Sequence, residues 1–318
     1  MQPYERRGAM RTLRVKAALE AGAPKILLRL LVLIVQLPGL MVQESIDVLE
    51  VFAGRRRITK AIRSLGYRAV PFDKCMSDRM DINTDEGFCI LLALALALAP
   101  GGLLWLAPTC SSWVWINSGT HMRNFVTWAG NTDHAYIRSA NKMVSRCALL
   151  IWIVTLRGGS WALEQPRSSV LEAHDRLQEI FRKTKVFWSC ACMGAFRGTS
   201  LKPLQFWSSA TWIGELSKYK VKNKTLRKSQ TYKRYMNKRG WAVDGNLGAL
   251  RDTQSYTRRF GRVVASIYDQ GRVVPPPPAA GVGSDDDMSL LEMLSSDDSW
   301  QDAELDSVFA FLRGSAAP

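Results

Sequence analysis

Apolar residues form short continuous runs that alternate with stretches of helical spacing, beginning at residue 46. Residues 48–52 are a short, mostly apolar run, as in a buried parallel strand, and Gly54 follows in a turn. One helix face is then marked by Ile58, Ala61, Ile62 and Leu65. Gly66 stands where this helix should stop, and a second strand ends at Asp73. Residues 46–73 therefore predict one unit of strand, turn, helix and strand.

The same order continues toward the C-terminus. An apolar stretch at 88–99 predicts a buried helix, broken by the glycine pair at 101–102, and residues 103–107 predict a buried strand. The pattern next predicts a long helix around 140–154, a strand at 160–163, a helix at 168–182, a strand at 185–190 and a closing helix at 253–268. This order predicts an α/β fold with a doubly wound, mostly parallel sheet.

Composition divides the chain into four regions. They are an N-terminal extension at 1–44, an α/β domain at 45–268 with a short basic insert at 216–242, a proline-rich linker at 269–284, and an acidic, disordered tail at 285–318.

The N-terminal extension is basic and ends in an apolar run at 26–42. Arg29, Gln36 and Pro38 interrupt this run, so it is too short and too broken for a confident membrane span. We expect a helix packed on the domain or a poorly ordered extension, and a targeting segment is the alternative.

Charge is distributed unevenly along the chain. The net charge is +15, but residues 275–318 carry nine acids and one base, a net of −8, so the remainder carries +23. A net charge of +23 on residues 1–274 favours a polyanionic partner, nucleic acid first and an anionic membrane second. The tail alternates acidic and apolar residues, a pattern typical of segments that fold on a partner. We expect it to bind a protein partner or the chain's own basic face.

The basic insert carries the strongest local charge. Residues 218–239 contain ten Lys or Arg and no acid: Lys218, Lys220, Lys222, Lys224, Arg227, Lys228, Lys233, Arg234, Lys238 and Arg239. Tyr219, Tyr232 and Tyr235 are interleaved with them. A solvated helix face would carry mixed signs, whereas one sign with aromatic residues favours phosphate contacts and base stacking. The same run is suited to nuclear import.

Cysteine and histidine usage excludes some classes of site. The six cysteines are scattered through apolar segments, which indicates an intracellular protein, nuclear if the source is eukaryotic, rather than a secreted disulfide framework. Cys190 and Cys192 have no second pair at zinc spacing and the chain has three histidines, so we expect no metal site. Cys110 alone directly follows a predicted strand and lies among Ser and Thr, at the sheet edge where α/β folds place their chemistry.

The order of these pieces resembles the DNA cytosine-5 methyltransferases, across about residues 46–268. Asp47-Val48-Leu49-Glu50-Val51-Phe52-Ala53-Gly54 is similar to the family's first motif, Pro108-Thr109-Cys110 to its Pro-Cys loop, and Leu163-Glu164-Gln165-Pro166 to its Glu-Asn-Val motif. The resemblance implies a Rossmann-like methyltransferase fold that binds S-adenosylmethionine. The cofactor-binding residues it implies are Glu50, Phe52, Ala53, Gly54, Asp73, Asp81, Ile82 and Pro108. It also implies that the helix beginning near Tyr256 returns to the cofactor.

The resemblance assigns the chemistry to two residues. Cytosine C5 is a poor nucleophile, so a thiolate, here Cys110, first adds to C6 of the base. Glu164 would protonate or hydrogen-bond N3, a role that suits a carboxyl group whose pKa is raised by burial. The target base has to be flipped out of the duplex. DNA is the expected substrate, in preference to RNA.

Three departures from the family pattern support an alternative. Residues 55–57 are all arginine where the family has a second glycine, so a side chain there either strains the turn or fills the pocket. Gln165 replaces an asparagine, and the Gln-x-Arg-x-Arg motif has no match beyond Arg197 and Lys202. The alternative is a catalytically inactive, methyltransferase-like protein that binds nucleic acid.

Overall fold

A computed structural model describes residues 45–199, 201–222, 232–238, 240–245 and 254–272. The expectations for residues 1–44, for most of the linker and for the acidic tail lie outside this part of the chain. The main sheet has the strand order β2-β1-β3-β4-β6-β5. Its strands are β1 (Ile46–Val51), β2 (Ala69–Phe72), β3 (Leu98–Leu106), β4 (Ser160–Pro166), β5 (Phe187–Cys192) and β6 (Pro203–Ser208).

The sheet is mixed but mostly parallel, which confirms the predicted α/β class. β1 pairs in parallel with β2 and β3, and β3 with β4, whereas β6 runs antiparallel to both β4 and β5. β6 is reversed because the chain leaves β5 through the short 3₁₀ helix η4 (Met193–Phe196) instead of a crossover helix. Consequently β6 begins at the edge of the sheet where β4 ends, with Leu204 opposite Pro166.

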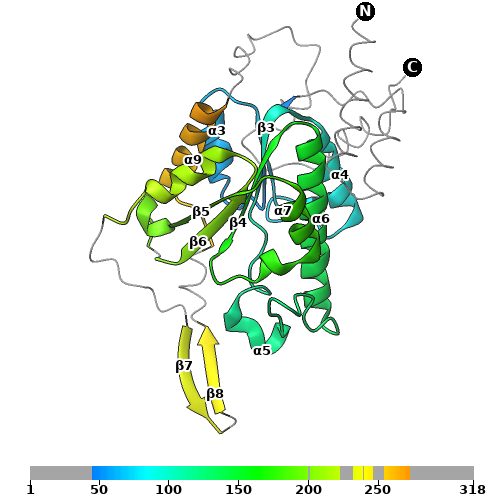
Figure 1. Cartoon of the computed structure of the whole chain (residues 1–318), viewed down its shortest axis with the longest axis vertical. Helices are drawn as coiled ribbons and strands as arrows, with labels where there is room; N and C mark the ends of the chain where they lie inside the picture. Colours follow the sequence, from blue (N-terminus) through cyan, green and yellow to red (C-terminus); the bar gives the residue numbers. More distant parts are fainter. Residues whose placement is uncertain (1–44, 200, 223–231, 239, 246–253, 273–318) are drawn as a thin grey trace, which may run out of the picture.

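Helices cover both faces of the sheet (Figure 1). On one face lie α4 (Asp85–Leu96), α6 (Ala135–Leu156) and α7 (Asp175–Lys183), whose apolar sides form one buried core with the sheet. On the other face lie α3 (Arg57–Arg63) and α9 (Arg258–Gly271), which form the second core. α9 packs so closely on α3 that a Cβ atom at Gly261 would lie 2.2 Å from the backbone oxygen of Arg57. This arrangement fits the predicted doubly wound fold.

Several predicted boundaries are wrong. β3 begins at Leu98 and includes the glycine pair, because Gly101 adopts a positive φ of 76° and its N–H donates to the backbone of Gly158. α7 begins at Asp175 rather than 168, where His174 caps it by accepting from the N–H of Arg176. Leu65 lies beyond the end of α3 and is exposed, not part of its buried face.

The end of the domain also differs from the prediction. α9 continues to Gly271, three residues past the expected limit of 268. The 3₁₀ helix η5 (Thr211–Lys218) begins ahead of the predicted basic insert and ends within it, and the hairpin of β7 (Tyr232–Asn237) and β8 (Gly240–Gly245) follows. This hairpin projects away from the sheet (Figure 1), and β8 extends past the predicted insert boundary of 242.

α6 is long and apolar enough to cross a membrane, and no other helix in the described part of the chain is. Its apolar residues, among them Val144, Ile151 and Val154, are buried against the sheet. We therefore regard α6 as a core helix.

Candidate functional site

A cavity of about 370 Å³ lies where strands β1 to β4 end and β6 begins. Its lining combines two groups of predicted site residues, which are far apart in sequence. One group is Phe52, Ala53, Gly54, Asp73, Asp81, Ile82 and Pro108, and the other is Cys110, Glu164 and Lys202. The structure thus brings the predicted cofactor residues and the predicted reacting residues around one space, whose volume is in the range of small-molecule sites.

The turn after β1 is held to the end of β2 by Asp73. One carboxylate oxygen of Asp73 accepts a hydrogen bond from the N–H of Gly54 at 2.9 Å, and the other accepts from Cys75 at 2.8 Å. Gly54 has a positive φ of 48°, and Phe52 one of 62°. Asp73 is therefore fixed in place at the cavity wall, with lone pairs left for a ligand.

Glu50 differs from the other predicted cofactor residues because it does not line the cavity. Its carboxylate is buried beneath α3 and accepts hydrogen bonds from the N–H groups of Ile58 and Thr59 and from the Thr59 hydroxyl. Burial raises the pKa of Glu50 to about 7, although these hydrogen bonds act in the opposite direction. Its observed role is to hold the first turn of the helix.

The three arginines after Gly54 do not have equivalent positions. Arg56 adopts the left-handed conformation with a φ of 55°, so the predicted backbone strain falls on this residue. Arg55 and Arg57 line the cavity. The Nε atom of Arg57 is buried and has no hydrogen-bond partner among the described residues. A cationic group thus stands at the cavity wall, where an anionic ligand group would satisfy it.

Cys110 lies in the loop after β3, as predicted, with its sulfur 4.0 Å from the Nζ of Lys202. Burial raises the pKa of the Cys110 thiol and Glu164 raises it further, whereas Lys202 lowers it. The side chain of Gln165 steadies this loop by donating to the backbone oxygen of Pro108 at 2.6 Å. The thiol of Cys110 is therefore shielded from solvent, and the ammonium group of Lys202 beside it favours its ionisation.

Glu164 is a buried acid at the end of β4. Burial raises its pKa to about 7, while Lys202 and a hydrogen bond from Tyr256 lower it. The Tyr256 hydroxyl lies 3.1 Å from Oε2 of Glu164. Near neutral pH the carboxyl group therefore titrates, so it can both donate and accept a proton.

The reversed strand explains how Lys202 reaches the cavity. Lys202 immediately precedes β6, and the antiparallel direction places the start of β6 beside the end of β4. From the sequence, Lys202 was expected only as a nucleic-acid contact, and its position beside Cys110 and Glu164 was missed.

Tyr256 was expected only to begin a helix near the cofactor. Its contact with Glu164 was missed. Thr257 caps α9, and this cap was the feature of the sequence that could have placed Tyr256 directly before the helix.

A comparison with protein-family models found no match, and comparisons with curated proteins and with solved structures found none either. The site is therefore interpreted from its own residues. The described residues contain no group of three or more His, Cys, Asp or Glu side chains placed to hold a metal ion.

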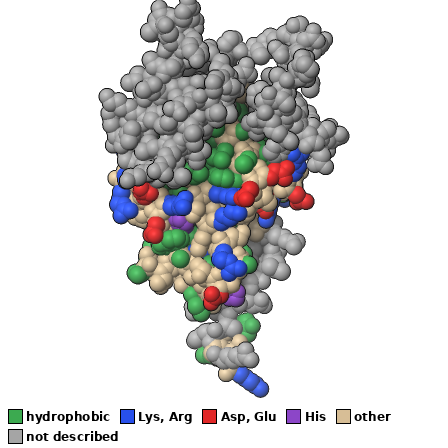
Figure 2. Space-filling model, turned by 90° about the vertical axis from the view of Figure 1, so that its right-hand side faces the viewer, with side chains coloured by type: hydrophobic (Ala, Val, Ile, Leu, Met, Phe, Trp, Pro, Cys, Tyr) green, Lys and Arg blue, Asp and Glu red, His purple; other side chains and the backbone are tan. Residues whose placement is uncertain are grey.

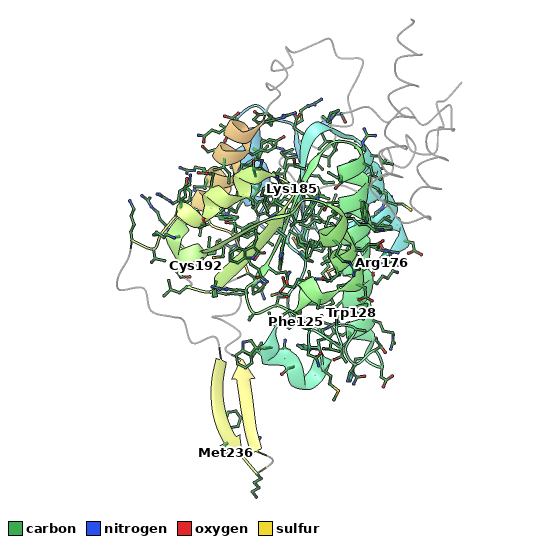
Figure 3. The ribbon with its side chains drawn as sticks, in the orientation of Figure 1. Phe125, Trp128, Arg176, Lys185, Cys192 and Met236 are labelled. Carbon is green, nitrogen blue, oxygen red and sulfur yellow. The ribbon has the colours of Figure 1, made fainter. Side chains whose placement is uncertain are left out.

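A second surface borders the cavity on the loop between β3 and α6. Arg123 is buried with its guanidinium 3.7 Å above the Trp113 ring, and it donates to Asn141 and to the backbone of Trp128. Tyr136 binds Ser111, a cavity residue, at 2.6 Å. The exposed large apolar residues of this surface are Trp115, Met122, Phe125, Val126 and Tyr136. Figure 3 shows Phe125 and Trp128 at the end of the molecule that also carries Met236 of the hairpin.

The predicted nucleic-acid residues are spread over different surroundings. Of those that the structure describes, Lys202 is the one that lines the cavity, and Arg197 is exposed nearby on the chain, with a positive φ of 62°. Lys218 pairs with Glu215 at 2.7 Å, so part of its charge is compensated. Lys220, Lys222 and Lys238 are exposed, β7 contains Lys233 and Arg234, and Lys224, Arg227, Lys228 and Arg239 lie outside the described residues. The face shown in Figure 2 carries cations and acids together.

Proposed function

We propose that this protein is an S-adenosylmethionine-dependent methyltransferase that acts on C5 of cytosine in nucleic acid, DNA in preference to RNA. The observation that carries the proposal is one cavity lined both by Gly54, Asp73 and Asp81 and by Cys110 and Glu164. Methyl transfer needs a cofactor and a nucleophilic residue within reach of one base, and a shared cavity provides that proximity.

The residues at the reacting end suit the chemistry of cytosine. The Cys110 thiol would lose its proton to a solvent water as its sulfur forms a bond to C6, and Glu164 would give its proton to N3 as electrons of the C5–C6 double bond move into the ring. The cofactor supplies the electrophilic methyl group to C5. A base would then remove the C5 proton so that the C5–C6 double bond re-forms and the Cys110 thiolate leaves. A Glu164 pKa of about 7 fits an acid that operates near neutral pH.

The resting state of Cys110 is a thiol, because burial raises its pKa. Lys202, 4.0 Å away, is the group that would stabilise the thiolate when the substrate enters. The same ammonium group lowers the pKa of Glu164, so one cation influences both reacting residues.

The surroundings of the cavity suit a nucleic-acid substrate. The loop between β3 and α6 follows the cavity residue Ser111 and offers exposed aromatic and apolar side chains, the start of α6 adds Tyr136, and the basic insert offers exposed lysines. Aromatic residues stack on bases and lysines contact phosphates. Such a surface would hold a flipped or single-stranded base near Cys110.

Adduct formation tests the assignment of Cys110. DNA containing 5-fluorocytosine should trap the wild-type protein covalently in the presence of cofactor, because the fluorine at C5 prevents release. Cys110→Ser should form no adduct yet retain cofactor binding by titration calorimetry. Cys89→Ser is the matched control, since Cys89 is exposed on α4 and lies outside the cavity lining. A wild-type protein that binds cofactor and DNA but never forms the adduct would exclude the cytosine reaction.

A second candidate is a protein of this fold that binds nucleic acid without chemistry. The positions of Arg55 and Arg57 at the cofactor end favour it, because their side chains can occupy the space of the cofactor. Calorimetry with S-adenosylmethionine and its demethylated product decides between the two. Binding that is lost in Asp73→Ala supports the enzyme, and no binding up to millimolar cofactor supports the alternative.

A further inference from the structure

Behind the cavity, three side chains form a chain of hydrogen bonds that ends at Glu164. Trp105, fully buried on β3, donates its indole N–H to the Tyr256 oxygen over 3.3 Å. The Tyr256 hydroxyl lies 3.1 Å from Oε2 of Glu164. The Tyr256 ring is held by aromatic contacts with Phe260, at 4.6 Å between centroids, and with Trp105, at 6.3 Å. The hydroxyl is therefore fixed in position.

The chemistry of the indole sets the direction of both hydrogen bonds. An indole nitrogen can only donate, so the Tyr256 oxygen accepts from Trp105. The hydroxyl hydrogen is then left for Glu164, and Oε2 of Glu164 accepts it at 3.1 Å. Burial raises the pKa of Tyr256 well above its ordinary value, so the hydroxyl keeps this hydrogen. The donor and acceptor roles are thus fixed by the fold and not by the substrate.

We propose that Tyr256 is a positioning residue that reserves Oε2 of Glu164 as an acceptor and thereby places the proton of this acid on Oε1. In a protonated carboxyl group the carbonyl oxygen is the better acceptor, so a bond donated to Oε2 favours the form protonated on Oε1. The inference rests on the proposed role of Glu164. In that reaction the Oε1–H bond breaks and an N3–H bond forms. The electron pair stays on the carboxylate, which keeps the hydrogen bond from Tyr256.

Other ionisable groups also face this acid and its partner. Lys202 approaches from the segment before β6, Cys110 from the loop after β3, and Glu50 acts on Tyr256 from β1. All three remain when the Tyr256 hydroxyl is removed. Replacing only that hydroxyl therefore isolates the effect of the hydrogen bond from the effect of the neighbouring charges.

The test compares Tyr256→Phe with Tyr268→Phe in the full chain. Tyr268 is the matched control because it lies on α9, follows Tyr256 by twelve residues, and donates its hydroxyl to the backbone oxygen of Asp47 at 3.2 Å, away from the cavity. The titration of Glu164 is followed by its ¹³C carboxyl resonance, assigned by its disappearance in Glu164→Gln. We expect Tyr256→Phe to raise the pKa of Glu164 by about one pH unit, because the ionised form loses a hydrogen bond. Tyr268→Phe should leave it unchanged.

Methyl transfer gives a second readout that a merely structural role would not move. The pH at which kcat declines on the alkaline side should shift upward in Tyr256→Phe, with KM for DNA unchanged. An unaltered Glu164 titration, or the same shift in Tyr268→Phe, would overturn the proposal. If the titration moves as expected in a protein that transfers no methyl group, the placement of the proton stands and the proposed reaction is what fails.

Discussion

Glu50 at the end of β1 and Glu164 at the end of β4 are both buried, and burial raises the pKa of each to about 7. Their surroundings differ. Glu50 accepts three hydrogen bonds from the first turn of α3, all within one βαβ unit. Glu164 accepts from Tyr256, a residue 92 positions away in sequence, and faces the cavity together with Lys202 and Cys110.

The difference shows that a raised pKa alone does not mark a reacting group. Glu50 is enclosed by donors that belong to the backbone it supports, so its protonation affects the fold. Glu164 borders a cavity with one oxygen held by a side chain, so its protonation is available to a ligand. Structural networks perturb pKa values as strongly as functional sites do, and the partners distinguish the two cases.

Truncation should separate the two glutamates most strongly. Glu50→Ala leaves the N–H groups of Ile58 and Thr59 and the Thr59 hydroxyl without an acceptor in a buried site, so the free energy of unfolding should fall by roughly 3 to 5 kcal/mol. Glu164→Ala adjoins a cavity that water can enter, so its loss should be about 1 kcal/mol or less. Urea denaturation at pH 7 measures both, and equal losses would show that the two sites do not differ as described.

The pH dependence of stability should be shared by both sites. Because the pKa of Glu164 is raised from 4.5 to about 7, its protonated form adds stability that is complete below pH 4.5 and is lost as the pH rises through 7. Glu164→Gln does not titrate. The free energy of unfolding of Glu164→Gln minus that of the wild type should therefore increase by about 3 kcal/mol from pH 4.5 to pH 8.5.

Glu50→Gln should show a similar slope, since its pKa is raised in the same direction. Urea denaturation of the variants across this pH range checks the prediction. A flat difference for Glu164→Gln would mean that this carboxyl group is not protonated in the folded protein near neutral pH.

The smallest effect concerns the turn that contains the arginines. Arg56→Gly removes a side chain from a left-handed backbone position, which should stabilise the protein by about 0.5 kcal/mol after the greater flexibility of glycine in the unfolded chain is subtracted. Arg55→Gly relieves no left-handed strain, because Arg55 is not among the residues with positive φ, and should destabilise by a similar amount. Thermal denaturation of the two variants should therefore give midpoint shifts of opposite sign.

Much of the fold follows from local patterns in the sequence. The βαβ unit was predictable because Ile58, Ala61 and Ile62 mark one buried helix face, and Gly66 ends the turn with a φ of 84°. The start of α7 was not, because His174 is an uncommon cap and the apolar pattern extends ahead of it. β6 was not among the predicted strands, and the apolar pattern of a strand does not show its direction in any case.

The site was predictable to the extent that its residues follow strands. Asp73, Cys110 and Glu164 all lie at the carboxyl ends of parallel strands, and the cavity joins them as expected. Lys202 precedes a strand, so its arrival there depends on the direction of β6. The bond from Tyr256 to Glu164 spans 92 residues and depends on how α9 docks, which local periodicity does not specify. Glu50 belongs to the same predicted motif as Gly54, but its carboxylate binds the first turn of α3 instead of lining the cavity.

The reversal of β6 also affects how this protein can diversify. Among the described residues, the cavity edge is reached by segments that leave β1, β2, β3 and β4 toward a helix, by the segment before α9, and by one segment that arrives from η4 and enters β6. Lengthening a segment of the first kind moves the start of a helix. The segment from Arg197 to Lys202 has no helix to displace, so insertions there would add new side chains beside Cys110 while leaving the scaffold intact. We therefore expect changes in the length of this segment to alter substrate preference without altering the fold.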